Sequence, residues 1–475
     1  MKRVSLALSV TLLGGCTLGP DFKAPQVTGP VVWTQGSAAS RTVDKGISPQ
    51  WWGIFHDATL TRLITRAAQA NLDLKAATAR LMQAQAERRV IGGDSQPSVN
   101  GAVSYQRARN SQEGLQDISG LDGKRAYNVW QPGVDASWEL DMWGRARREL
   151  ESASASVEAS ADLRRAVLLT VQAETAGDYI QLRGIQAQRA TTEQNLTVAE
   201  HSLKLTSVRL SDGVATQLEV AEARAQVAAI QARLPILEQQ QSHLINALSY
   251  LMAEQPGALS RELNGVKPLP LTPVEVPVGL PSQLAQRRPD IRAAEAQLHA
   301  ATAEIGVATA DFYPSITLSA NAGLQAMQFN QLGQWGSHFY NFGPGLNLPI
   351  FEGGRLRGQL ALRKAQQQEA AVHFQQTVLK AWHEVDDAMV DYDTHQRQRQ
   401  KLVTVVEDSQ IALDNAQRQY IAGATDFLNV LTVQQALLDA QQSLVISNTN
   451  VSMSLVRLYK ALGGGWEKAY PGGTV

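Results

Sequence analysis

The 475-residue sequence predicts a mixed α+β membrane protein, in which strands from several copies of the chain close a transmembrane β-barrel and long α-helices continue it as a tube. Three observations predict this fold class. The chain begins with an export signal, it contains an internal duplication, and each duplicated unit joins a segment of period two to a helical stretch of 67 residues. Period two is typical of half-exposed strands, whereas period 3.6 is typical of helices.

Residues 1–15 have the order of an export signal. Lys2 and Arg3 precede an apolar run from Val4 to Leu13, and two glycines follow the run. The run has about ten residues, and a membrane-spanning helix needs roughly 20. We therefore predict that this segment is a cleaved signal peptide.

Cys16, the only cysteine, follows the signal directly. Leu13-Gly14-Gly15-Cys16 resembles a bacterial lipobox, which implies cleavage before Cys16, a diacylglycerol on its sulfur and an N-acyl chain on the new amino terminus. A lipidated cysteine leaves no free thiol, as suits an oxidising compartment. An ordinary signal peptide with an incidental cysteine is the alternative.

The composition excludes several classes of protein. The net charge is −1, from 43 basic and 44 acidic residues without blocks of like charge, so nothing indicates a nucleic-acid partner. His383-Glu384 lacks the second histidine that a zinc-protease helix requires four residues on. No catalytic constellation is present in the sequence. We predict that the chain is not an enzyme and holds no metal and no cofactor apart from the lipid.

The duplication is visible when the sequence is aligned with itself. At an offset of 217, twelve of the 26 residue pairs between 73–98 and 290–315 are identical. Further on the offset becomes 210, and it pairs Gly144 with Gly354 and Gly213 with Gly423. The chain is therefore two copies of one unit of a little over 200 residues.

Each copy has the same order of elements: a helix, a β-hairpin, a very long helix and a return helix. Stretches of good helix formers between glycine-containing turns predict the helices. The predicted bounds are 58–93, 97–143, 145–211 and 216–252 in the first repeat (58–255), and 282–310, 312–351, 355–421 and 426–462 in the second (282–462). Pro235 is expected to kink the first return helix. A linker at 256–281 joins the repeats, and 463–475 form a C-terminal tail.

The hairpins have an apolar and a polar face. Ile316, Leu318 and Ala320 alternate with Thr317 and Ser319, for example. The two hairpin regions hold 13 of the 28 aromatic residues, several of them at strand ends, like the aromatic girdles of an outer-membrane barrel. A soluble antiparallel sheet with one wet face is the alternative.

Four strands per chain cannot close a barrel, because lipid does not solvate the unpaired backbone groups of an open sheet. The chain must therefore form oligomers. Two copies would supply eight strands and a filled barrel, whereas three would supply twelve and an open lumen. The polar, mostly uncharged faces of the strands fit a water-filled pore.

Several phrases of the sequence resemble signatures of the outer-membrane factor family, the TolC-like lipoprotein channels of the OprM and NodT type. They are "CTLGPDFKAP", "WWGIFHDATLTRLI", "RRPDIRAAEAQL", "ADFYPSITLSANAG" and "NLPIFEGGRLRGQL", and the resemblance runs from Cys16 to about Gly464. It implies a homotrimer in the bacterial outer membrane, with a twelve-stranded barrel, a periplasmic helical tunnel and an equatorial belt. Residues 16–57 would then be a lipidated arm leading to the equatorial belt, to which the linker and the tail also belong.

The resemblance also implies partners and a gate. The partners would be a periplasmic adaptor and an inner-membrane transporter, proton-driven and of the RND or MFS type. The adaptor would contact the two glycine turns, here Asp212 and Gly213 in the first and Gly423 and Ala424 in the second.

In closed members of the family, a tyrosine before one turn pairs with an acidic residue of the other turn. Tyr420 and Glu219 occupy these positions. Some relatives line the aperture with two aspartates, but this sequence has Asn429 and Thr432 at those positions. Glu222, with Glu219, is a candidate to supply negative charge at the aperture instead. The alternative for these polar residues is a solvated helix face.

The predicted function is a passive exit duct for small toxic molecules in a tripartite efflux pump. A channel for type I protein secretion is the alternative within this class, because the same architecture serves both. A trimeric lipid-anchored stalk is a remote alternative of another class, and the alternating strands argue against it.

Overall fold

The computed structural model describes residues 17–26, 42–43, 48–111, 125–270, 276–277 and 287–466. The chain divides into two compact units. Unit 1 contains Met1–Pro25, Leu81–Ser160 and Ala294–Phe374, and unit 2 contains Gln26–Arg80, Ala161–Ala293 and Gln375–Val475. Each unit therefore takes a segment from both repeats, so the compact units cut across the order of the repeats in the sequence.

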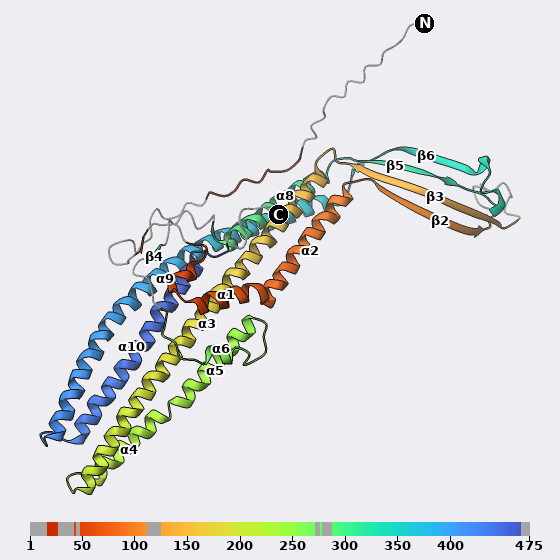
Figure 1. The fold of residues 1–475 in the computed structure, drawn as a ribbon. Helices are drawn as coiled ribbons and strands as arrows, with labels where there is room; N and C mark the ends of the chain where they lie inside the picture. The colour runs from red at the N-terminus through yellow and green to blue at the C-terminus, as the bar shows by residue number, and fades with distance from the viewer. Residues whose placement is uncertain are drawn as a thin grey trace. The chain divides into compact units, whose positions relative to one another are not determined.

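The two repeats form corresponding elements, coloured along the chain in Figure 1. The first repeat and the segments beside it contain η1 (Trp51–Phe55), α1 (Ala58–Ala70), α2 (Leu72–Asp94), β2 (Ser98–Ala108), β3 (Tyr127–Leu140), α3 (Arg145–Ser211), α4 (Gln217–Gln231), α5 (Leu234–Leu251) and α6 (Ser260–Leu263). The second contains α8 (Pro289–Ala310), β5 (Ser315–Leu324), η3 (Phe329–Gln331), η4 (Trp335–Ser337), β6 (His338–Asn347), α9 (Arg355–Ile421) and α10 (Phe427–Ala461). A two-residue parallel pair joins β1 (Thr42–Val43) to β4 (Val276–Pro277).

The long helices α3 and α9 have the predicted bounds, and each has 67 residues. A glycine with positive φ precedes each of them, Gly144 at +83° and Gly354 at +89°. Glycine adopts this conformation without the steric cost of a Cβ atom, so the chain can turn sharply from strand to helix. The Asp141 carboxylate then accepts hydrogen bonds from the free backbone N–H groups of Ala146 and Arg147, both at 3.1 Å.

The predicted helix 58–93 is interrupted at Asn71. The Asn71 side chain accepts a hydrogen bond from Leu74 N at 3.0 Å and donates one to Leu251 O at 3.0 Å. An asparagine that bonds nearby backbone in this way competes with the helix and starts a new one. The prediction of one continuous helix was therefore wrong at this residue.

Prolines explain the other differences from the predicted helices. The first return helix breaks between α4 and α5, with Pro235 in the first turn of α5, so the predicted kink is confirmed. The predicted helix 282–310 is observed from Pro289, where α8 begins, and its first residues lie outside the described part of the chain. Proline has no N–H to donate and is favoured in a first turn.

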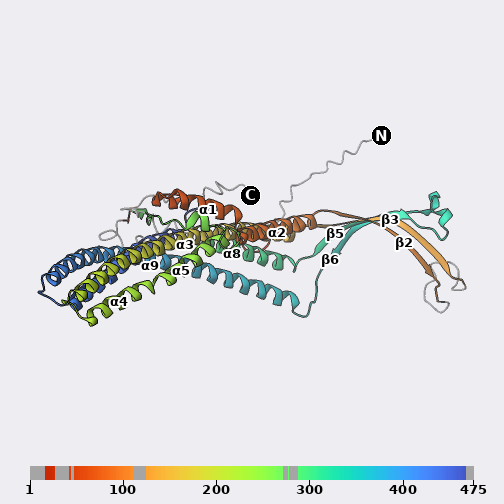
Figure 2. The same cartoon turned by 60° about the horizontal axis from the view of Figure 1, so that its bottom comes forward.

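Unit 1 contains an antiparallel sheet with strand order β2-β3-β5-β6, and its strands lie side by side in Figures 1 and 2. The central pair, β3 with β5, joins the two repeats, with Asp135 opposite Asn321 and Trp138 opposite Leu318. The strands β2 and β6 are the edges. Residues that face each other across strands share one side of the sheet.

The register confirms the two faces predicted from alternation. One face is apolar and largely exposed; it includes Val99, Val103, Val134, Trp138, Leu318, Tyr340, Phe342 and Leu346. The other face carries serines, asparagines and glycines, and one of its rows is Ser98, Ser137, Ser319 and Gly343. A sheet that exposes its apolar face is not stable in water, but it fits a lipid environment.

Unit 2 buries an apolar core between segments distant in sequence. Trp51 of η1 stacks on Tyr459 of α10 with ring centroids 5.4 Å apart, and α1, α3, α5 and α9 complete this core. The Tyr179 hydroxyl on α3 donates to the Asp57 carboxylate at 2.6 Å, and the same carboxylate caps α1. Among the described helices, none is long and apolar enough to cross a membrane.

Candidate functional site at the two helix turns

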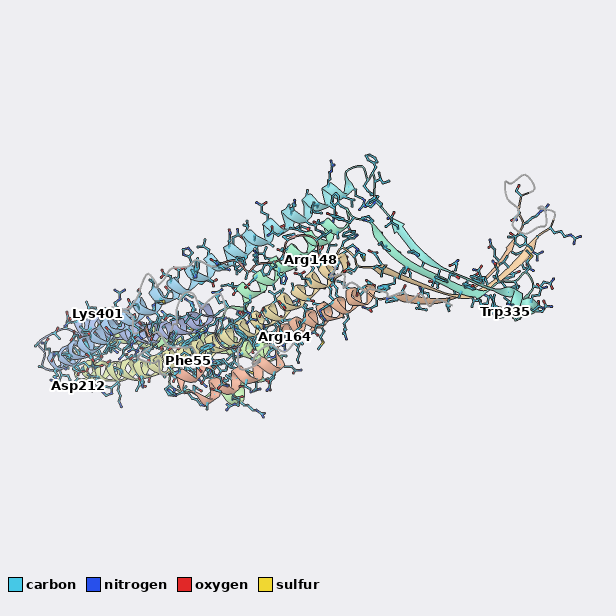
Figure 3. All side chains as sticks on the ribbon, turned by 90° about the horizontal axis from the view of Figure 1, so that it is seen from above. Phe55, Arg148, Arg164, Asp212, Trp335 and Lys401 are labelled. Carbon is cyan, nitrogen blue, oxygen red and sulfur yellow. The ribbon has the colours of Figure 1, made fainter. Side chains whose placement is uncertain are left out.

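The predicted gate residues lie around two turns of unit 2. The first turn (212–216) joins α3 to α4, and the second (422–426) joins α9 to α10. Figure 3 labels Asp212 at the tip of the first turn. A cluster of buried side chains from α4, α9 and α10 packs the two turns against each other, and it includes Ala223, Tyr420 and Phe427.

The two turns have the same backbone geometry. Gly213 and Gly423 have φ of +74° and +73°. In the first turn Val214 N donates to Arg209 O at 2.9 Å and Gly213 N to Leu210 O at 3.0 Å, and the second turn repeats both bonds. This is the Schellman arrangement, which satisfies the last carbonyls of a helix and requires a left-handed residue. The duplicated glycines thus have a structural role.

Glu219 is part of a helix cap. Its carboxylate accepts a hydrogen bond from Thr216 N at 2.6 Å, and the Thr216 hydroxyl accepts one from Glu219 N at 3.3 Å. This reciprocal pair is a capping box. The second turn replaces it with Asp426, whose side chain accepts from Asn429 N at 2.9 Å. Each turn therefore has one carboxylate in its helix cap. It belongs to the third helical residue, Glu219, in the first turn and to the N-cap residue, Asp426, in the second.

Tyr420 is buried, with 4% of its surface exposed. Its ring packs on Phe427 at 5.3 Å, and the Arg209 guanidinium lies 4.6 Å from the ring centroid. Its hydroxyl makes no hydrogen bond to any described residue, although Arg209 and Thr206 are close to it. Burial, followed by the negative charge of Glu219, raises the pKa of the Tyr420 phenol. Tyr420 and Glu219 are therefore near each other within one chain, but no hydrogen bond between them is observed.

The remaining predicted residues lie on the surface of the turns. Asn429 and Thr432 are exposed, and they bond within their own helix end, to Thr425 Oγ1 at 3.2 Å and to Leu428 O at 2.9 Å. Glu222 is half-buried one turn into α4. Asp212, Gly213, Gly423 and Ala424 are all exposed. Cys16, the predicted lipid site, lies outside the described residues.

The structure adds residues that the sequence did not single out. Val214, Leu218, Ile421 and Leu428 are 62%, 66%, 64% and 58% exposed at the two turns. Large apolar side chains grouped on a surface are typical of a protein-binding site. Leu218 and Leu428 occupy equivalent positions in the two repeats. This identity is the feature of the sequence from which an apolar surface at the turns could have been predicted. Arg209 was missed because its contact with Tyr420 joins α3 to α9.

The polar face of the sheet in unit 1 is a second candidate site. One row across all four strands consists of Asn100, Asp135, Asn321 and Asn341. Asn100 Nδ2 donates to Asp135 Oδ2 at 3.2 Å. Three amides and one carboxylate can hydrogen-bond water or a passing solute.

Known proteins resemble this chain over nearly its whole length. A family model described as "Outer membrane efflux protein" matches residues 63–254 and 280–464, which correspond closely to the two repeats. The antibiotic efflux pump outer membrane protein ArpC of Pseudomonas putida is 36% identical over 474 residues, covering 98% of this chain and 95% of the relative. The pyoverdine export outer membrane protein OpmQ of Pseudomonas aeruginosa is 34% identical over 471 residues, covering 98% of each.

Solved structures have the same fold. The outer-membrane channel OprN aligns with a TM-score of 0.89 and 32% identity, covering 95% of this chain and all of that one. The sheet with an apolar and a polar face and the long helices are thus the parts of a channel that crosses the outer membrane and continues into the periplasm. The chain belongs to the outer membrane efflux protein family, and three copies form a channel with a twelve-stranded β-barrel and a periplasmic helical tunnel.

Proposed function

We propose that this channel is the passive exit duct for small toxic organic molecules, and that its partners supply the energy. The observation that carries this proposal is the polar, almost uncharged face of the sheet, which in a closed barrel lines the pore without binding cargo strongly. Its relatives are named for efflux of antibiotics and toluene and for pyoverdine export. These names support a cargo of small organic molecules, and transport requires no bond-making by the chain.

The exposed apolar residues at the turns support a protein partner at the periplasmic tip. Val214 and Leu218 on one turn, with Ile421 and Leu428 on the other, offer an apolar surface beside Asp212 and Ala424. We assign this surface to a periplasmic adaptor, which in turn joins the channel to a proton-driven inner-membrane transporter of the RND or MFS type. The proposed acyl chains on Cys16 add a lipid anchor.

Accumulation of a fluorescent dye tests this function. Cells that lack their own outer-membrane efflux channels should accumulate less dye when this chain is produced together with a periplasmic adaptor and an inner-membrane transporter of an efflux pump. A Leu218→Glu, Leu428→Glu double variant should raise accumulation again, because two charges would interrupt the apolar surface. Export of a protein without any effect on dye would instead support type I secretion.

Tyr420 and Glu219 are our candidates for the gate. A buried hydroxyl without a partner costs about 1–3 kcal/mol, and a neighbouring copy in the trimer could supply the missing hydrogen bond. Glu222, Asn429 and Thr432 would surround the aperture, with no aspartate ring to bind cations.

Planar-bilayer conductance separates the gate from the helix cap. Tyr420→Phe should raise single-channel conductance at least twofold, whereas Tyr340→Phe, on the lipid face of the sheet, should not change it. Glu219→Gln preserves the capping box and removes the charge, so higher conductance in this variant would assign gating to the charge. Wild-type conductance in both Tyr420→Phe and Glu219→Gln would refute the gate.

A further inference from the structure

A recess in unit 2 lies where α10 ends at Ala461 and α8 begins at Pro289. Its volume is about 570 Å³, which is within the range of about 300–1,000 Å³ that pockets for small organic ligands have. Side chains of α3, α8, α9 and α10 line it, together with the residue before α8. Its charged lining residues balance in number: Arg288, Lys380, Arg457 and Lys460 against Asp290, Glu384, Asp387 and Asp391.

The recess and the apolar core lie on different faces of α9. Val385, Met389 and Tyr392 of α9 belong to the core, which η1 and α1 cover from the other side. The charged residues of α9 that line the recess are spaced four, three and four residues apart: Lys380, Glu384, Asp387 and Asp391. Residues at such spacings share one face of a helix. The recess is therefore separate from the core.

Arg288 fixes one wall of the recess. It is 7% exposed, and its guanidinium donates to the Asp290 carboxylate at 2.6 and 3.0 Å and to Ala461 O at 3.0 Å. The Glu384 carboxylate lies 2.7 Å from the same guanidinium and 3.7 Å from Lys380 Nζ. Four of the eight charges are thus paired with one another, and a nearly buried guanidinium requires such partners.

The other four charged side chains line the recess without pairing. Asp387 and Asp391 on α9 form an acidic pair, and Arg457 and Lys460 on α10 form a basic pair. All four are exposed, and within the described part of the chain none has an oppositely charged group within 4.0 Å. The two helices lie side by side (Figure 1). The recess therefore keeps two carboxylates and two cations apart across open space.

Buried small and apolar side chains lie between the two pairs. Leu169 of α3 is 7% exposed, Ala388 of α9 6% and Ala461 of α10 7%. An elongated molecule could cover these side chains with an apolar body, place an ammonium group at the acidic pair and a carboxylate at the basic pair. Both ends would then form charge-assisted hydrogen bonds. A molecule with only one of these groups would leave the other pair without a partner.

We propose that the recess is a transit site for small organic zwitterions that carry an amine at one end and a carboxylate at the other. The acidic pair binds the ammonium group, and the basic pair binds the carboxylate. The site faces the interior of the helical tunnel, because η1 and α1 cover the opposite side of the helices. Exposed charges attract each other only weakly, so the site delays cargo without trapping it. This inference rests on the proposed function, within which it names a class of cargo.

Saturation-transfer NMR on the purified trimer tests the site, because the method detects weak ligands. The probe is 4-(aminomethyl)benzoic acid, a rigid zwitterion at neutral pH. Its methyl ester keeps only the positive charge, and its N-acetyl derivative keeps only the negative one. The zwitterion should have a dissociation constant at least tenfold lower than either derivative. Equal dissociation constants for the three compounds, or no binding of the zwitterion, would overturn the proposal.

Two double variants separate the two pairs. Asp387→Asn with Asp391→Asn should raise the dissociation constant of the zwitterion at least tenfold, to that of the N-acetyl derivative, because the amine loses its partners. Arg457→Gln with Lys460→Gln should raise it equally, to that of the methyl ester. All four side chains are exposed, so heat-resistant trimers should still form. An unchanged dissociation constant in either double variant would refute a zwitterion site.

Glu407→Gln with Asp408→Asn is the matched control, since it removes two exposed carboxylates of α9 outside the recess. Its dissociation constant for the zwitterion should stay within twofold of wild type, and a tenfold rise would mean that overall charge, rather than the recess, determines binding. Dye accumulation distinguishes this inference from the proposed function. Efflux of dye without binding of the zwitterion would refute the site alone, whereas binding without efflux would refute the duct and leave the recess as a binding site.

Discussion

Single residues at the turns serve the fold and the proposed gate together. Glu219 completes a capping box and also lies close enough to Tyr420 to raise the pKa of its phenol. For this reason an alanine substitution would be ambiguous, since losing a cap costs about 1 kcal/mol by itself. The Glu219→Gln variant removes only the charge.

Asp178 on α3 provides a pH-dependent test at the scale of one residue. Burial, followed by the charge of Glu174, raises its pKa to about 6. The folded protein therefore favours the protonated carboxyl, and the stability that Asp178 contributes should fall as the pH rises from about 4 to about 6. Asp178→Asn should unfold at a higher temperature than wild type at pH 7.5 and at nearly the same temperature at pH 4.

Thermal unfolding of the purified trimer at several pH values checks this prediction. Glu174→Gln is the control for the smaller cause of the raised Asp178 pKa, the charge of Glu174. It should also raise the unfolding temperature at pH 7.5, but by less than Asp178→Asn does. If Asp178→Asn and wild type differed in unfolding temperature by the same amount at pH 4 and at pH 7.5, the ionised Asp178 carboxylate would not be what destabilises the folded protein.

Among the elements, the glycine turns allow a comparison between identical substitutions. Gly423 has φ of +73°, whereas Gly358 lies inside α9 with open space around it. Gly423→Ala should destabilise the end of α9 by about 1–2 kcal/mol, and Gly358→Ala should stabilise the helix by up to about 1 kcal/mol. Hydrogen exchange should accordingly become faster around residues 418–428 only in Gly423→Ala. Equal exchange in the two variants would argue against a role for the turn.

Neighbouring residues of β2 test the two faces of the sheet. Val103 is 81% exposed on the apolar face, and Ser104 lies on the polar face. Val103→Lys should cost about 2–4 kcal/mol in a lipid environment and reduce the amount of heat-resistant trimer in the outer membrane. Ser104→Lys should leave assembly nearly unchanged and alter ion selectivity instead. The opposite pattern would reverse the assignment of the faces.

Local signals explain which elements could be predicted from the sequence. The ends of α3 and α9 were predicted correctly because glycine turns mark them in both repeats. The break at Asn71 was missed because its neighbours are good helix formers and its partner, Leu251 O, is 180 residues away. The surroundings of Tyr420 were missed for the same reason, since Arg209 and Phe427 come from other helices.

At the scale of the whole molecule, the repeats in the sequence are not the units of packing. Each compact unit contains segments of both repeats, and β3 of the first repeat pairs with β5 of the second. A fragment that ends at the linker would therefore lack half of the sheet and half of the helical core. Such a fragment is not expected to fold alone.

The strand order β2-β3-β5-β6 also bears on how such a channel could arise. The strands alternate in direction, so β6 of one copy can meet β2 of the next in the same antiparallel manner in which β3 meets β5. Six copies of a half-length ancestor could close the same cylinder. Fusion of two such half-length chains places three of the six strand junctions within single chains, so the cylinder is closed by three contacts between chains in place of six. The fused halves can then diverge, and the two turns do have different helix caps.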